Sequence, residues 1–232
     1  MTVRRMFPFI TCTWNPLGGE CKHLCEYCWA RKLIERNKFA KYQGRPRLVE
    51  KEMERQFKSG DFVFVCDMCD LFGYWVPDEL IEKVLEVTRR FPETHFLFLT
   101  KNPGRYYYLM GRGRAGNNVV LGATIESNRR FPELSRALYP LDRLQSMYRL
   151  RLDPYVGGRH ARFISIEPIL DFDLEFIPLI TRVVPWAVAV GYDNYGHHLP
   201  EPSLEKTLDL IRQLEANHII VYRKTLREAW NS

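Results

Sequence analysis

Short, almost uninterrupted apolar runs alternate with amphipathic segments along this chain, and this alternation restricts the fold more than any other feature. The runs at 62–66 and 95–99 are separated by a segment that opens with Pro77, Asp78 and Glu79 and repeats apolar residues at helical spacing. Strands that are apolar at every position are typical of parallel sheets covered by helices. The sequence therefore predicts an α/β fold built on a parallel sheet.

Six strand–helix units and a remnant can be recognised. We expect strands at 7–13, 62–66, 95–99, 119–123, 162–166 and 186–190, with a last short strand at 218–222. We expect helices at 29–37, at 49–57, from 77 onward, at 105–110 and at 203–214. Six units fall short of the eight that close a (β/α) barrel.

Length and composition favour one domain. With 232 residues, 46% of them hydrophobic, the chain is long enough for one α/β barrel. We expect a single domain over residues 1–232, with one long insertion at 128–160. No apolar run is long enough to span a membrane, and the first six residues lack the apolar core of a signal peptide. We therefore expect a cytoplasmic protein without a membrane segment.

Three cysteines stand close together, Cys21, Cys25 and Cys28, in a C-x3-C-x2-C spacing. Zinc sites favour paired C-x2-C knuckles, and a redox dithiol needs only C-x-x-C. Three thiolates this close can each bind a different iron of a [4Fe–4S] cube, which four cysteines usually hold. The charged and polar residues between them make a buried-core role unattractive. The spacing predicts an iron–sulfur cluster with one iron left free.

The residues around these cysteines resemble the radical S-adenosylmethionine superfamily. Its C-x3-C-x-aromatic-C motif matches residues 21–28, with Tyr27 as the aromatic. The blocks at 13–16, 70–72, 96–103 and 165–168 are similar to an uncharacterised, phage-associated subfamily. The resemblance implies a partial (β/α)6-type TIM barrel with parallel strands, a [4Fe–4S] cluster, and S-adenosyl-L-methionine bound to its free iron. It also implies an enzyme that cleaves this cofactor to a 5′-deoxyadenosyl radical, with an electron donor such as ferredoxin or flavodoxin.

Polar residues follow the expected strands at their carboxyl ends, where α/β barrels carry their chemistry. The resemblance places cofactor contacts there, although the superfamily's usual Gly-Gly-Glu-like segment is missing. Asp67 or Asp70 is predicted to accept the ammonium group of the cofactor instead. The other candidates are Glu126 or Ser127 for the ribose hydroxyls, Arg129 or Arg130 for the carboxylate, and Thr124, Ser165, Glu167 and Asn194. For each, the alternative is an ordinary polar residue at the mouth of the barrel.

Cys66 and Cys69 follow the second expected strand, where the superfamily more often has small residues. Four interpretations are open. They are core cysteines, a redox pair or disulfide, ligands of a second metal site with Cys12, or donors of a hydrogen atom to a substrate radical. Their position at a strand end makes Cys69 and Cys66 the candidate catalytic residues.

The chain is basic, with a net charge of +6. Residues 101–162 carry twelve Lys or Arg against four Asp or Glu, interleaved with tyrosines. Such a segment suits phosphates and stacked bases, which makes a nucleic acid or a phosphorylated compound the candidate substrate. Reversing Arg112, Arg114 and Arg149 would test it. The alternatives are a solvated basic face and, for the whole chain, a non-catalytic iron–sulfur or zinc protein that binds nucleic acid.

Overall fold

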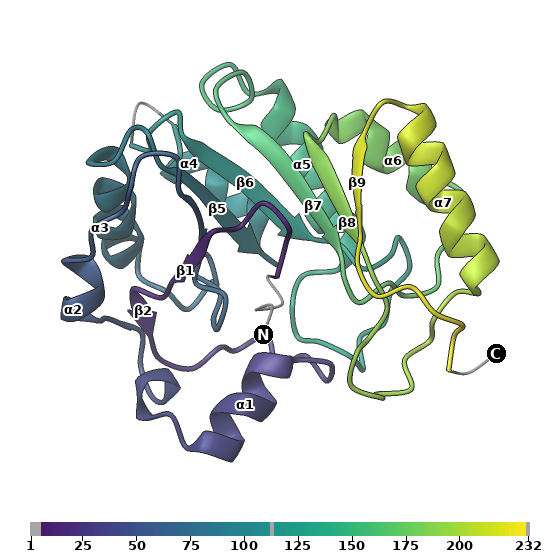
Figure 1. The fold of residues 1–232 in the computed structure, drawn as a ribbon, viewed down its shortest axis with the longest axis horizontal. Coiled ribbons are helices and arrows are strands. Elements are labelled where there is room, and N and C mark those ends of the chain that lie inside the picture. Colours follow the sequence, from purple (N-terminus) through teal and green to yellow (C-terminus); the bar gives the residue numbers. More distant parts are fainter. Residues whose placement is uncertain (1–5, 112–113, 231–232) are drawn as a thin grey trace.

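A sheet of seven parallel strands, in chain order, curls into half a barrel (Figure 1). The computed structural model describes residues 6–111 and 114–230. The strands are β1 (Cys12–Trp14), β4 (Phe62–Val65), β5 (His95–Thr100), β6 (Val119–Thr124), β7 (Ala161–Ile166), β8 (Ala187–Val190) and β9 (Ile220–Arg223). The predicted partial barrel with parallel strands is confirmed, and the remnant at its end is a full member of the sheet.

Helices connect the strands and cover the outer face of the sheet (Figure 1). They are α1 (Trp29–Asn37), α2 (Glu50–Met53), α3 (Asp78–Arg89), α4 (Tyr106–Leu109), α5 (Pro140–Leu152), α6 (Phe176–Val183) and α7 (Leu204–Ala216), with the 3-10 turns η1 (Ala40–Tyr42) and η2 (Pro103–Arg105). A small antiparallel pair, β2 (Leu17–Gly18) and β3 (Arg47–Leu48), lies outside the main sheet. Within the described residues, no helix is both long and apolar enough to cross a membrane.

Four elements differ from the predictions. The first strand was expected at 7–13, but β1 begins at Cys12, because residues 7–10 leave the sheet and pack inside the barrel. The helix expected at 49–57 is a single turn, α2. The segment expected as an insertion at 128–160 contains α5, the helix that joins β6 to β7, and α6 was not predicted at all. Residues 1–5, part of the stretch inspected for a signal peptide, lie outside the described residues.

Side chains alternate between the two faces of the sheet, as the two-residue period of a strand requires. In β7, Phe163 points into the barrel, Ile164 packs beneath the helices, and Ser165 faces the interior again. Bulky rings fill the interior toward the amino ends of the strands, where Phe7 lies 5.0 Å from Phe163 and 5.8 Å from Phe64 between ring centres. The core therefore closes that end of the barrel and leaves the carboxyl ends open.

Candidate functional site

A cavity of about 730 Å3 lies at the carboxyl ends of the strands. The loop between β1 and α1 lines one side, and the ends of β4 to β9 and the N-terminal segment before β1 also contribute. Most of the predicted site residues meet here: Cys21, Cys25, Cys28, Cys66, Asp67, Cys69, Asp70, Thr124, Ser165, Glu167 and Asn194. Glu126, Ser127 and Arg129 are not among its lining residues. The carboxyl-end rule for α/β barrels therefore locates the cavity correctly.

The cysteine loop, residues 15–28, ends where α1 begins. Cys28 caps this helix, and its Sγ accepts a hydrogen bond from the N–H of Arg31 at 3.3 Å. The Cys28 N–H in turn donates to the carbonyl of Cys25 at 3.2 Å, which closes a tight turn between the two cysteines. A sulfur at the amino end of a helix lies in the positive field of the backbone dipoles. The loop geometry thus favours negative charge at Cys28.

Burial acts in the opposite direction on the thiols. It raises the pKa of Cys21 to about 12, and the Asp70 carboxylate and the thiols of Cys25 and Cys28 add to that rise. Burial also raises the pKa of Cys28. Free of a cation, both thiols stay protonated at neutral pH, whereas coordination to a metal removes the thiol proton. The mutual influence of the three sulfurs indicates that they lie close together.

The donor set fits an iron–sulfur cube better than a zinc ion. Across residues 6–111 and 114–230, no three His, Cys, Asp or Glu side chains are placed to bind one metal ion. Tetrahedral zinc needs ligands that converge on a single ion. In a cube each thiolate binds a different iron, so the sulfurs need only surround it. Cys21, Cys25 and Cys28 all line the cavity and supply three thiols of the kind that a cube binds.

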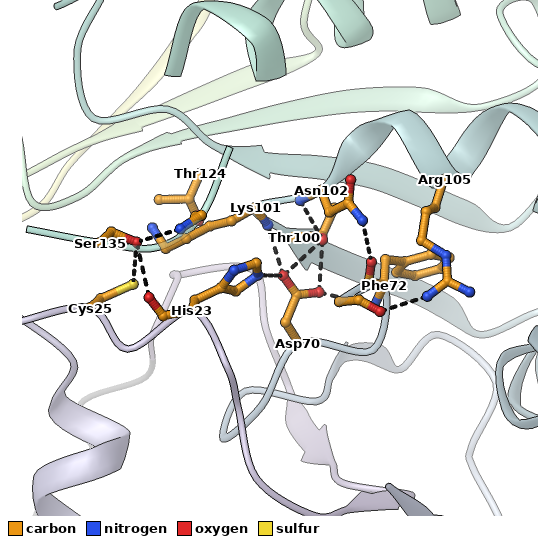
Figure 2. A network of polar contacts seen from close by, with 12 residues as sticks. His23, Cys25, Asp70, Phe72, Thr100, Lys101, Asn102, Arg105, Thr124 and Ser135 are labelled. Atoms are coloured by element: carbon orange, nitrogen blue, oxygen red, sulfur yellow. Dashed lines mark hydrogen bonds and ion pairs between the residues drawn. The ribbon is translucent and has the colours of Figure 1, made fainter. Parts of the chain in front are cut away.

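Asp70 ties the cysteine loop to the barrel (Figure 2). Its Oδ2 accepts from His23 Nε2 at 2.7 Å and from the Lys101 N–H at 2.9 Å, and its Oδ1 accepts from Thr100 Oγ1 at 2.7 Å and the Phe72 N–H at 2.9 Å. Burial alone would raise the pKa of Asp70, but these hydrogen bonds and the charge of His23 lower it below its ordinary value. Both oxygens are engaged within the protein, which leaves Asp70 poorly suited to bind a cofactor.

Glu126 lies behind the cavity wall in a buried ionic cluster. Its carboxylate pairs with Arg143 at 2.7 Å and with Lys101, and it accepts a hydrogen bond from Tyr27 Oη at 2.5 Å. Burial would raise the pKa of Glu126, yet the two cations hold it far below its ordinary value. Glu126 is therefore a permanent anion that anchors the last turn of the cysteine loop. The structure does not bring it to the cavity as a ribose ligand.

Ser127 and Arg129 are likewise engaged elsewhere. Ser127 Oγ donates to the carbonyl of Asp171 at 2.5 Å, and Arg129 pairs with Asp171 and, at 2.6 Å, with Asp173. Arg130, the second candidate for the cofactor carboxylate, stacks on Tyr139 with its guanidinium 4.4 Å from the ring centre. These residues brace the loop after β6.

Two carboxylates inside the cavity remain more open. Asp67 Oδ1 accepts from Asn15 Nδ2 at 2.5 Å, and burial raises the pKa of Asp67. Glu167 lies 3.7 Å from Lys224 Nζ, and burial raises its pKa although Lys224 opposes the shift. Asn194 Oδ1 accepts from Thr225 Oγ1 at 2.5 Å, which leaves its amide nitrogen free to donate. Polar groups therefore line both sides of the cavity.

Cys66 and Cys69 form a thiol pair in the same cavity. Both are free cysteines, Cys66 has a left-handed φ of 58°, and its thiol is hydrogen-bonded to Cys69. That bond, together with burial, raises the pKa of Cys69 well above its ordinary value. Cys12, the third member of the predicted second metal site, lines the same cavity. The metal-site, redox, hydrogen-donor and core interpretations of the pair all stay open.

Several cations of the basic segment 101–162 are engaged in contacts within the protein. Arg105 pairs with Asp78, Arg114 lies 3.2 Å from Glu82, and Arg143 is buried against Glu126. Other members bind backbone carbonyls, among them Arg162 and Arg151. Arg112 lies outside the described residues. The charge surplus of this segment is therefore a weak indication of a polyanion site.

Sequence analysis missed three residues of the site. His23 lies inside the cysteine loop, and Lys101 and Lys224 each follow directly on the last residue of a strand, β5 and β9. The position just after a barrel strand was therefore a usable signal for both lysines. The sequence predicts β9 only as a remnant, so it gives no expectation for the residue that follows this strand.

The fold is similar to that of spore photoproduct lyase. A mutant with bound AdoMet and dinucleoside spore photoproduct matches with a TM-score of 0.64 and 14% identity, over 97% of this chain and 81% of that chain. A complex with dinucleoside spore photoproduct matches with a TM-score of 0.61 and 14% identity, over 95% and 80% of the two chains. At this identity the likeness shows the fold alone, a partial barrel of parallel strands.

Sequence comparison adds a family without adding an activity. The comparison with curated proteins finds no match. One family model, described as a protein of unknown function, DUF5131, matches residues 6–216. That span covers the cysteine loop and all but the last strand of the barrel. The chain belongs to the DUF5131 family.

Proposed function

We propose that this chain is a radical S-adenosylmethionine enzyme, in which Cys21, Cys25 and Cys28 hold a [4Fe–4S] cluster and leave one iron for the cofactor. The observation that carries the proposal is that the three thiols of the cysteine loop line one cavity at the barrel mouth. The likeness in fold to a spore photoproduct lyase with bound AdoMet supports it. When bound, cluster and cofactor supply radical chemistry, and the protein supplies position and exclusion of water.

Asp67 is the residue we assign to the ammonium group of S-adenosylmethionine. Its carboxylate lines the cavity, and Asn15 engages one of its two oxygens. Asp70 instead positions the loop, because its oxygens already accept from His23 and from the residues after β5. The groups we assign to the ribose and the base are those of Thr124, Ser165, Glu167 and Asn194.

We assign Cys66 and Cys69 a redox role toward the substrate. The raised pKa of Cys69 keeps its S–H bond intact at neutral pH, so this thiol can give a hydrogen atom to a carbon radical. The C–H bond forms as the S–H bond breaks, and one electron from the protein's electron donor and one proton from solvent return the sulfur to the thiol. Cys66, a free cysteine whose thiol lies beside that of Cys69, shares the site. The alternative is a pair of buried core cysteines.

An acidic electron carrier, such as ferredoxin or flavodoxin, is the partner that the surface beside the cluster loop favours. Residues 22–47 carry eight Lys or Arg and two Glu, a surplus of six that equals the +6 of the whole chain. Helix α1 runs through this stretch from its cap at Cys28, and Lys32 and Arg36 are exposed on it one turn apart. Opposite charge speeds the encounter of two proteins. We call residues 22–47 the basic α1 region.

Nucleic acid remains the second candidate partner, with less support. In the tyrosine-rich segment 101–162, several arginines form ion pairs within the protein. The basic α1 region has one exposed large aromatic side chain, Phe39. Single-stranded nucleic acids favour surfaces with several stacking rings. A non-catalytic iron–sulfur protein, the other class, would leave Asp67 and Glu167 in the cavity without a role. The phage-associated resemblance, the single domain and the cytoplasmic location stay predictions.

Electron paramagnetic resonance tests the proposal. After anaerobic reconstitution and reduction, the cluster signal should change when S-adenosylmethionine is added, because the cofactor binds the free iron. Asp67→Asn should raise the cofactor concentration needed for this change while the iron content stays the same. Asp70→Asn should instead disturb iron retention, because it loosens His23 in the cysteine loop. A signal that is indifferent to the cofactor would favour the non-catalytic alternative.

A further inference from the structure

The segment at 131–139 packs against the outer side of the cysteine loop. Two backbone hydrogen bonds join them: the Glu26 N–H donates to the Leu134 carbonyl at 2.9 Å, and the Arg136 N–H donates to the His23 carbonyl at 2.8 Å. These bonds lie on either side of Ser135 in the sequence. The backbone therefore fixes the position of Ser135 without any help from its side chain.

The Ser135 hydroxyl faces the sulfur of Cys25 (Figure 2). Its Oγ lies 3.1 Å from Cys25 Sγ and 3.4 Å from the His23 carbonyl, and it accepts from the Ala137 N–H at 3.1 Å. A hydroxyl has one proton to donate. Once Cys25 is a thiolate bound to iron, the sulfur has no proton, and Ser135 is the donor of this pair. Sulfur is also the nearer of the two acceptors.

The cysteine sulfurs of the loop have two kinds of hydrogen-bond donor. The backbone N–H of His23 serves Cys21, and that of Arg31 serves Cys28. Among the described residues, Cys25 receives its hydrogen bond from a side chain, Ser135. A backbone donor cannot be removed by an ordinary substitution, whereas this one can. A substitution of Ser135 therefore changes the hydrogen bonding of the Cys25 sulfur without altering the backbone.

We propose that Ser135 is a positioning residue that raises the reduction potential of the cluster through its hydrogen bond to Cys25. A one-electron reduction adds negative charge to the cluster and its sulfurs, and a donor at a sulfur stabilises the reduced form more than the oxidised form. Cys25 is buried, and such a bond is stronger in a low-dielectric interior than in water. The electron comes from the external reductant. This inference rests on the proposed function, because it requires the cluster.

A redox titration of the reconstituted protein, followed by electron paramagnetic resonance, tests the inference. The midpoint potential should move to a more negative value in Ser135→Ala and stay near that of the unchanged protein in Ser135→Thr, which keeps the hydroxyl. Ser146→Ala is the matched control, because Ser146 Oγ donates to a carbonyl on the exposed face of α5. Iron content is measured in every variant.

The outcomes separate the two proposals. If the unchanged protein takes up no cubane cluster, the proposed function fails. If the cluster forms and Ser135→Ala has the same potential as the unchanged protein, the inference about Ser135 is overturned. If Ser135→Ala loses iron, the redox titration is repeated with Ser135→Cys. A thiol is a weaker donor than a hydroxyl, so the midpoint potential of Ser135→Cys must lie below that of the unchanged protein. An equal potential would again overturn the inference.

Discussion

The thiols of the cysteine loop are the residues on which the account depends most. Burial and neighbouring negative groups raise the pKa of Cys21 to about 12, and burial raises the pKa of Cys28, so ionising these two thiols is costly without a cation. Coordination to iron would offset this cost, because the metal displaces the thiol protons. The proposed function therefore requires a metal group at this loop.

Alanine substitutions should separate this loop from the second cysteine pair. Cys21→Ala, Cys25→Ala and Cys28→Ala should each lose the cubane absorbance and most of about four irons per chain. Cys66→Ala and Cys69→Ala should keep the absorbance and the iron, because these two cysteines follow β4 and are not part of the C-x3-C-x2-C loop. Iron and sulfide analysis after anaerobic reconstitution measures this. Stoichiometric zinc without iron in the unchanged protein would contradict it.

Glu126 should matter for stability more than for cofactor binding. Replacing it by Gln leaves the buried charge of Arg143 without its partner, and breaking such a pair costs roughly 3–5 kcal/mol. The folded-state pKa of Glu126 lies below the ordinary value of 4.5. The stabilisation is therefore complete above that pH and is lost as the pH falls toward the folded-state pKa.

Urea unfolding of Glu126→Gln and the unchanged protein measures this effect. The difference in the free energy of unfolding should be largest near neutral pH and should shrink below about 4.5, the ordinary pKa of the group. An equal difference at all pH values would contradict the ionic account. A variant as stable as the unchanged protein would show that Arg143 does not need its partner.

At this scale the sequence predicted what lies close together in the chain. The three cysteines could be assigned because eight residues contain them all, and Asp67 and Asp70 because they follow a strand. The role of Glu126 could not be predicted from the sequence. Its partner Tyr27 lies 99 residues before it, and its partner Arg143 lies on helix α5. Whether a polar residue binds a cofactor or a buried partner depends on such distant contacts.

Among the elements, α1 connects the cysteine loop to the surface. It begins at the Cys28 cap and carries exposed Lys32 and Arg36. An electron carrier that docks on this helix would approach the cysteine loop directly. The element therefore has a structural role at its first residue and a proposed recognition role along its outer face.

Charge reversal on α1 should slow electron delivery by a protein. The double variant Lys32→Glu with Arg36→Glu should be reduced by an acidic ferredoxin about tenfold more slowly at low salt. The difference should vanish at high salt, where such attraction is screened. Reduction by dithionite, which needs no docking surface, should change far less. Stopped-flow spectroscopy measures both rates.

Arg212→Glu is the control for this prediction. Arg212 is exposed on α7, away from the cysteine loop (Figure 1). Its reversal should leave the ferredoxin rate close to that of the unchanged protein. Equal slowing by the α1 and α7 variants would mean that overall charge, and not α1, governs the encounter. Tight binding of the unchanged protein to single-stranded DNA that the α1 variant loses would favour nucleic acid instead.

Most elements could be predicted from local patterns, and the exceptions have local reasons. The helix α7 begins where Ser203 caps it, with Glu205 in its first turn, as the sequence indicated. Helix α5 was hidden in a basic segment, although Pro140 and Asp142 mark its first turn. Helix α6 is short and strongly apolar, so its sequence resembles that of a buried strand. The inward turn of residues 7–10 has no local signal, because only the barrel rings around Phe7 make it favourable.

At the scale of the whole molecule, the aromatic core at the amino ends of the strands stabilises the barrel whose carboxyl ends form the cavity. Phe7 is fully buried among Phe64 and Phe163, and the Lys224 ammonium lies 5.0 Å from the centre of its ring. Phe7→Ala should therefore lower the free energy of unfolding by about 3–5 kcal/mol. Phe39→Ala, at a ring that is 41% exposed on the surface, should change it by about 0.5 kcal/mol at most. Equal effects in thermal or urea unfolding would show that residues 7–10 do not belong to the core.

The formation of 5′-deoxyadenosine tests the central claim most directly. Anaerobically reconstituted protein, reduced in the presence of S-adenosylmethionine, should release 5′-deoxyadenosine and methionine, detected by liquid chromatography with mass spectrometry. Cys21→Ala, which removes one of the three predicted cluster ligands, should release neither. Protein that carries a full [4Fe–4S] cluster, accepts an electron and still forms no 5′-deoxyadenosine would contradict the account.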